Sequence, residues 1–238
     1  MSNIHRSSSF SAVNSKSSDA GLRSYMQRIY TLMSLALFIT AIIAFFVSKN
    51  DELMRVIHST NLKWVVMLAP LGFVFIFASK IHSMSATTAK NCLWAFSALM
   101  GLSLSYLLLV YTGHSVVRVF LITSCMFGVT SFYGYVTKKD LTGWGSFLMM
   151  GLIGVIIASI VNSFMQSSAL DFAISIIGVI VFTGLTAYDT QKAKNMYYQV
   201  ASGDSSTIQK VAIMSALSLY MNFINLFIML LRLFGDRR

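Results

Sequence analysis

Long apolar stretches alternate with short polar ones along almost the whole chain. After a serine-rich start, seven runs of roughly 16 to 24 mostly apolar residues follow one another, and a run of this length can cross a bilayer as a helix. The polar connections between the runs are short, except at 49–63 and 190–210. The predicted spans are 29–47, 62–79, 92–111, 116–136, 146–166, 170–189 and 211–234.

This pattern predicts an all-α, polytopic membrane protein, a bundle of seven transmembrane helices formed by residues 25–238. Charged residues make up only 11 % of the chain, whereas soluble proteins have about 25 %. Residues 1–24 hold nine serines and few large apolar side chains. We therefore expect them to form a disordered serine-rich cytoplasmic tail.

The basic residues predict the orientation of the bundle. With seven spans, 11 of the 18 Lys and Arg residues fall on the side of the amino terminus and 7 on the other side. The positive-inside rule then places the amino terminus in the cytoplasm and the carboxyl terminus outside. The formal charge of +10 is accordingly an orientation signal. We expect no nucleic-acid partner.

The sequence contains none of the common motifs of an enzyme or a cofactor site. Cys92 and Cys125 lie within apolar runs without CxxC spacing, and the four histidines are scattered. HExxH, GxSxG, P-loop and GxGxxG patterns do not occur. We expect no catalytic residue, no cofactor and no resident metal.

Two aspartates border the apolar run 170–189. Asp171 and Asp189 are 18 residues apart, about five turns of a helix, so they project from one face. Ionisable groups near membrane depth are costly and often mark a functional path. We expect Asp171 to cap the helix at its amino-terminal end. The depth of Asp189 depends on whether the helix continues through 190–200.

The last span carries a line of polar residues at steps of three and four. In lipid such a stripe must face protein or water. The sequence is compatible with interhelical hydrogen bonding and with one wall of a hydrophilic path. The stripe consists of Ser215, Ser218, Asn222, Asn225 and Arg232.

Small residues also recur at helical spacing in two of the spans. Glycine, alanine and serine let helices approach closely in lipid. We therefore expect close packing at Ser97, Gly101 and Ser105, and at Gly151, Gly154 and Ala158.

Three segments resemble the Bax inhibitor-1 family, the transmembrane Bax-inhibitor-motif proteins, and most closely its bacterial members. They are FTGLTAYDTQKAK (182–194), ALSLYMNFINLFIMLLRLFG (216–235) and LTGWGSFLMMGLIG (141–154). The resemblance implies a seven-helix bundle around a partly hydrated path. Members have been described as pH-sensitive calcium leak channels, and others as modulators of cell death or of a membrane-bound AAA protease.

The resemblance implies a pair of aspartates, one in the YDTQ element and one in the following helix. Asp189 matches the first position, but the second falls on Asn222 in LYMNF. Two close carboxylates share a proton and can act as a pH latch. Asparagine removes the repulsion and supplies an amide donor, so the sequence predicts a weaker or more acidic pH response and a lower calcium affinity.

The leading hypothesis is a cation leak channel, carrying calcium or another cation, in a bacterial inner (plasma) membrane. Asp189 is its ionisable control point, and Asn222, Ser218 and Asn225 line the path. Asp171 and Arg232 have no assigned role in it. The alternative is a regulatory protein that modulates a membrane-bound AAA protease or a stress or cell-death response.

Overall fold

The computed structural model describes residues 3–59, 62–81 and 83–238, with side chains described from residue 19 onward except at 58–59 and 63–64. Its described part is helical and contains one isolated β-bridge, between Tyr111 and Arg237. The helices are α1 (Asn3–Ser48), α2 (Asp51–Ser59), α3 (Leu62–Lys80), α4 (Ala86–Leu104), α5 (Leu107–Val110), α6 (Gly113–Val136), α7 (Thr142–Met165), α8 (Ser168–Val200) and α9 (Ser205–Phe234).

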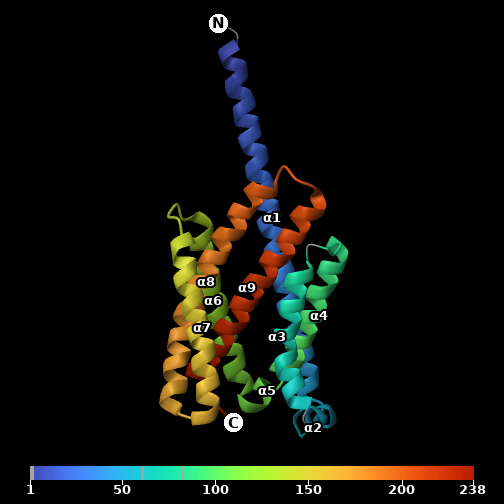
Figure 1. Cartoon of the computed structure of the whole chain (residues 1–238), viewed down its shortest axis with the longest axis vertical. Coiled ribbons are helices and arrows are strands. Elements are labelled where there is room, and N and C mark those ends of the chain that lie inside the picture. Colours follow the sequence, from blue (N-terminus) through green and yellow to red (C-terminus); the bar gives the residue numbers. More distant parts are fainter. Residues whose placement is uncertain (1–2, 60–61, 82) are drawn as a thin grey trace.

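Six helical segments within the described residues are long and apolar enough to cross a membrane, which supports the predicted class. They fall in α1, α4 with α5, α6, α7, α8 and α9. The predicted span 62–79 coincides with α3, whose apolar part, Val65–Lys80, is shorter. The predicted count of seven spans is therefore not confirmed, although the two termini lie at opposite ends of the bundle (Figure 1).

Helix α9 is the centre of the bundle. Of its most apolar segment, 61 % is buried, against 11–39 % in the other five spans. It packs against α8, α1, α6 and α4 (Figure 1). A helix enclosed in this way can carry polar groups without exposing them to lipid, provided that they find partners.

A buried hydrogen-bond junction ties α9 to α1 and α4. Tyr220 Oη lies 2.7 Å from Thr40 Oγ1, and Thr40 Oγ1 is 2.9 Å from the carbonyl oxygen of Ser97. Because the hydroxyl hydrogen of Thr40 goes to a carbonyl, Tyr220 donates to Thr40. Three helices thus share one satisfied polar contact inside an apolar core.

Close helix packing at the small residues is confirmed at Gly101 and Gly151, but the prediction for Gly154 is wrong. A Cβ atom added to Gly101 would lie 2.8 Å from Ile43 Cβ in α1, and one added to Gly151 would lie 2.9 Å from Val181 Cγ2 in α8. A Cβ atom at Gly154 would meet nothing within 4 Å. Gly154 therefore faces away from the bundle, contrary to the prediction.

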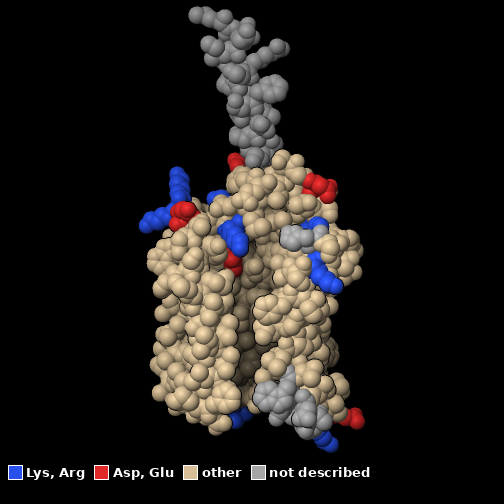
Figure 2. Space-filling view, in the orientation of Figure 1, with Lys and Arg blue, Asp and Glu red and all other residues tan. Residues whose placement is uncertain are grey.

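Charged side chains gather at the two ends of the molecule, and the belt between them is largely free of Lys, Arg, Asp and Glu on the face shown in Figure 2. This distribution is expected for a bundle that spans a bilayer. Leu22 is the first buried residue of α1 among the described side chains. The disordered tail predicted for 1–24 remains a prediction, because the side chains of residues 1–18 lie outside the described part of the structure.

A close contact between α6 and α8 at Gly134 predicts that alanine substitutions at two glycines of α6 have very different effects on stability. An added Cβ at Gly134 would overlap the carbonyl oxygen of Ala187 and lie 2.9 Å from its Cα, whereas one at Gly128 would meet nothing within 4 Å. We expect Gly134→Ala to lower the free energy of unfolding by about 1–3 kcal/mol, because backbone cannot move aside cheaply. The measurement is thermal unfolding in detergent.

Gly128→Ala is the matched control for this prediction. It makes the same chemical change on the same helix and should be neutral or stabilise by up to about 1 kcal/mol, since alanine favours a helix over glycine. Equal melting temperatures for the two variants would contradict the close approach of α6 and α8.

Candidate functional site: one turn of α8 and its partners

The four side chains of one turn of α8, Tyr188–Gln191, contact four different parts of the structure. Successive residues of a helix point about 100° apart, so a turn that is surrounded by other helices can contact all of them. The Tyr188 ring packs on α7 at Gly145, where an added Cβ would overlap it. The other three side chains make hydrogen bonds to α9, to α6 and to the loop between α6 and α7.

The carboxylate of Asp189 accepts a hydrogen bond from the side chain of Asn222. The Nδ2 of Asn222 donates a hydrogen bond of 2.7 Å to Oδ2 of Asp189, and Asn222 is only 5 % exposed. Helix α8 continues to Val200, so Asp189 lies within it and points toward α9. The structure thus brings together the two residues that the resemblance paired.

A cavity of about 490 Å³ reaches Asp189 from the end of the bundle that holds the α8–α9 connection. Its polar lining consists of Asp189, Lys192, Thr207, Lys210, Ser215 and Ser218. Figure 2 shows a groove that runs down this face of the bundle, with acidic and basic side chains near its upper end. Asp189 is the acidic residue among those that line the cavity.

Beyond Asp189, the interface of α8 and α9 is filled by buried apolar side chains. Met229 of α9 packs onto Gly178 of α8, where an added Cβ would lie 2.8 Å from its Cγ and Sδ. Phe182 of α8 and Leu226 of α9 are buried in the same apolar cluster as Met229. Asn225, one turn beyond Asn222, is only half-buried.

Thr190 belongs to a chain of hydroxyl groups that crosses three helices. Its Oγ1 donates to the carbonyl oxygen of Thr186 at 2.7 Å and lies 2.9 Å from Ser131 Oγ, which lies 2.7 Å from Tyr30 Oη. Because the hydroxyl hydrogen of Thr190 goes to the carbonyl group, Ser131 donates to Thr190, and Tyr30 donates to Ser131. The chain ties α1 and α6 to the turn that holds Asp189.

A match to the family described as Inhibitor of apoptosis-promoting Bax1 covers residues 22–238. The chain belongs to the Bax inhibitor-1 family. It is 47 % identical over 223 residues to an uncharacterized protein of Rickettsia prowazekii, RP147, covering 94 % of each chain. It is 44 % identical over 220 residues to the inner membrane protein YbhL of Escherichia coli K12, covering 92 % of this chain and 94 % of that one.

Other bacteria hold similar proteins, among them an uncharacterized protein of Caulobacter vibrioides that is 44 % identical over 229 residues, with 92 % of this chain and 91 % of the relative covered. With the apolar helices described above, the match makes this chain an integral membrane protein, which we expect to sit in a lipid bilayer. The resemblance read from the YDTQ segment and the last span is thereby confirmed.

Gln191 holds the loop between α6 and α7 in this family member. Its Nε2 donates to the carbonyl oxygen of Lys139 and its Oε1 accepts from the backbone N–H of Leu141, both at 2.8 Å. In the same loop, Asp140 accepts hydrogen bonds from the hydroxyl and the N–H of Thr142, and these bonds hold the pKa of the Asp140 carboxyl below its usual range.

Removing the Gln191 side chain should open this loop. We expect Gln191→Ala to speed amide hydrogen exchange at Leu141 about tenfold. The substitution removes the acceptor of the Leu141 N–H, and losing this hydrogen bond costs a net of about 1–1.5 kcal/mol. Exchange measured by mass spectrometry on the purified protein checks this. Asn195→Ala, an exposed site one turn further along α8, is the control and should leave the loop unchanged.

At the other end of the α8–α9 pair, two ion pairs between side chains connect the start of α8 to the end of α9 and the residues after it. Arg232 Nη1 lies 3.2 Å from Asp171 Oδ1, and Arg237 Nη2 lies 3.9 Å from Oδ2 of the same carboxylate. The helix cap is Ser167, whose Oγ accepts from the N–H of Leu170, so the expectation that Asp171 caps the helix is wrong. Asp171 lies in the first turn of α8, where the helix dipole favours it.

The polar stripe of α9 is therefore divided among several partners. Ser215 and Ser218 line the cavity, Asn222 binds Asp189, and Arg232 pairs with Asp171 at the opposite end. The sequence did not predict the contacts of Thr190, Gln191 and Tyr30. For Thr190 and Gln191 a signal was available, because they belong to the polar YDTQ run within apolar surroundings. Among the described residues, no group of three or more His, Cys, Asp or Glu side chains is arranged to hold a metal.

Proposed function

We propose that this protein is a cation leak channel, permeable to calcium, in which Asp189 is the ionisable control point. The observation that carries the proposal is the 2.7 Å bond from Asn222 to Asp189 at the end of a cavity of about 490 Å³. The pair stands where that cavity meets the closed apolar interface of α8 and α9.

The residues that line the cavity suit the passage of a cation better than its tight binding. Calcium favours oxygen ligands, and a tight site needs several carboxylates. Here one carboxylate is combined with the hydroxyl groups of Ser215, Ser218 and Thr207. Conduction requires such weak sites, which a cation can enter and leave. Lys192 and Lys210 line the same cavity and lower the local cation concentration, which fits a slow leak.

The Asp189–Asn222 pair supports a latch that responds little to pH near neutrality. An amide donor stabilises an ionised carboxylate without the repulsion that a second carboxylate would bring. The proposal places the gate at this pair, because moving α9 away from α8 breaks the bond and opens the apolar interface beyond it. A steep flux response between about pH 6 and 8 that survives Asp189→Asn would contradict this latch.

The test is calcium uptake into proteoliposomes across about pH 5 to 8, with protein-free liposomes as the baseline. The proposal also assigns the chain to a bacterial inner membrane with its amino terminus in the cytoplasm. It expects flux to survive removal of residues 2–18, since the described burial of α1 begins at Leu22. If no variant carries flux above the baseline, the channel assignment fails, and a regulatory role toward a membrane protease or stress response takes its place.

A further inference from the structure

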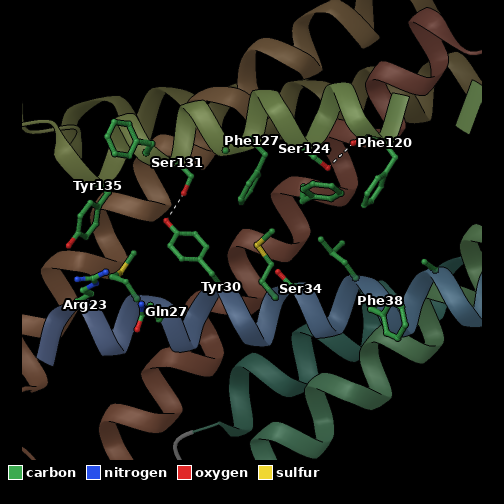
Figure 3. Close-up of a pocket in the computed structure, with 17 residues that line it drawn as sticks. Arg23, Gln27, Tyr30, Ser34, Phe38, Phe120, Ser124, Phe127, Ser131 and Tyr135 are labelled. Carbon is green, nitrogen blue, oxygen red and sulfur yellow. Dashed lines mark hydrogen bonds between the residues drawn. The ribbon is translucent and has the colours of Figure 1, made fainter. Parts of the chain in front are cut away.

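Another cavity lies between α1 and α6, and Asp189 is not part of its lining. It has a volume of about 880 Å³ and is open along one side. Figure 3 shows α1 and α6 facing each other across it, with the rings of Tyr30, Phe127 and Phe120 between the two helices. The Tyr30–Ser131 hydrogen bond of 2.7 Å crosses it near one end.

A second cavity of about 540 Å³ continues the first. The two share Leu37, Phe38, Ala41, Phe120 and Phe223 in their linings. Together they follow α1 from Arg23 to Phe46, about 35 Å at ~1.5 Å per residue, which is close to the thickness of a bilayer's hydrocarbon core. We call this continuous feature the α1–α6 groove.

The floor of the α1–α6 groove is aromatic and comes from α9. The Phe223 ring lies 5.5 Å from the rings of both Phe120 and Phe127, and Phe227 lies 6.3 Å from Phe120. The outer rims are exposed: Phe38 is 63 % and Phe132 67 % exposed. In a bundle surrounded by lipid, a groove with an apolar floor and open rims is accessible from the hydrocarbon.

The charged residue of the groove and most of its polar residues lie toward one end, whereas Ser34, Thr40 and Ser124 lie further along it. Arg23 and Gln27 of α1 stand at the charged end, opposite Tyr135 of α6 (Figure 3). Arg23 is exposed and takes part in no ion pair among the described residues. Lys194, whose Nζ donates to the carbonyl oxygen of Tyr135, also lies at this end, and Lys138, Lys139 and Lys192 are close to it in the chain.

We propose that the α1–α6 groove binds one acyl chain of an anionic membrane phospholipid, with the lipid phosphate at Arg23. The ligand must be long, largely apolar and charged at one end only, because the lining of the groove is mostly apolar and its one charged residue, Arg23, lies at one end. Guanidinium groups bind phosphate oxygens in a bidentate manner, and anionic headgroups concentrate near basic segments at the membrane surface. This proposal does not depend on the channel assignment.

Gly128 allows the groove to be filled without disturbing the fold. It lies on α6 in the lining of the groove, and an added Cβ meets nothing within 4 Å. Gly128→Trp should therefore place an indole in the space of the acyl chain. Gly154→Trp on α7 is the matched control, because Gly154 is also exposed with nothing within 4 Å of an added Cβ and does not line the groove.

The experiment is native mass spectrometry of the purified full chain in detergent, with phosphatidylglycerol or phosphatidylcholine of identical acyl chains. We expect the wild type and Gly154→Trp to retain one phosphatidylglycerol, and Gly128→Trp to bind it about tenfold more weakly. Arg23→Gln should remove the preference for phosphatidylglycerol over phosphatidylcholine while leaving a lipid bound. Circular dichroism confirms that each variant is helical.

Three outcomes would overturn the proposal. One is equal retention of phosphatidylglycerol by Gly128→Trp and the wild type. Another is a wild type that binds the two lipids equally well, which would remove the role of Arg23. The third is a wild-type dimer that Gly128→Trp converts to a monomer, since the occupant of the groove would then be a second copy of the chain.

Discussion

Calcium flux into proteoliposomes should fall about tenfold when Asp189 is replaced by asparagine. The substitution keeps the shape of the side chain and removes the one carboxylate among the residues that line the cavity. A cation at the cavity end then loses its charged ligand, and a loss of about 1.4 kcal/mol in cation affinity corresponds to this tenfold change. The initial rate of uptake at neutral pH, per reconstituted protein, is the quantity to measure.

Asp19→Asn is the control for the Asp189 variant. Asp19 is exposed on α1, interacts electrostatically with Tyr198 near the α8–α9 connection, and does not line the cavity. The control removes the same charge from the same end of the molecule, so flux should stay at the wild-type level. If both variants reduce flux equally, the effect comes from surface charge, and Asp189 is not the control point.

A new pH-dependent step should appear when Asn222 is replaced by aspartate. The hydrogen bond of 2.7 Å becomes a contact between two carboxyl groups, which cannot both be ionised cheaply and therefore share a proton. The shared proton holds the pair together at lower pH, and its loss drives α8 and α9 apart. We expect flux to rise steeply, by about tenfold or more, between about pH 6 and 8, where the wild type stays nearly flat.

Asn225→Asp separates this effect from the simple addition of a charge. Asn225 lies one turn further along α9, and among the described residues it makes no hydrogen bond to Asp189. An extra carboxylate there should leave the pH profile without a step. A flat profile for Asn222→Asp, or the same step in both variants, would contradict the latch. Flux that equals the protein-free baseline in all variants would remove the channel assignment itself.

Much of the architecture was predictable from the chain because lipid imposes simple rules. Backbone polar groups in hydrocarbon must be paired within the element, so a long apolar run has to be helical. Each predicted run falls on one of α1, α3, α4 with α5, and α6 to α9, but α1 begins at Asn3, well before its run 29–47, and α8 continues to Val200, beyond its run 170–189. The count of crossings was harder to predict, since α3 is near the length limit.

The candidate site was only partly predictable. Asp189 and Asn222 stood out as polar residues in apolar surroundings, and the structure brings them into contact. The partners of Thr190 and Gln191 could not be found in this way, because Ser131 lies 59 residues from Thr190 and Lys139 lies 52 residues from Gln191. Contacts of this separation depend on which helices are neighbours, and local patterns carry little information about that.

The sequence by itself determined that this protein is a helical membrane protein of the Bax inhibitor-1 family with an asparagine opposite Asp189. Only the tertiary structure decided which small residues face a neighbour, since Gly134 and Gly128 look alike in sequence but one abuts Ala187 and the other an open groove. The same holds for Asp171, which pairs with Arg232 while Ser167 caps the helix. The physical reason is that periodicity defines the faces of a helix, whereas packing with other helices decides what each face meets.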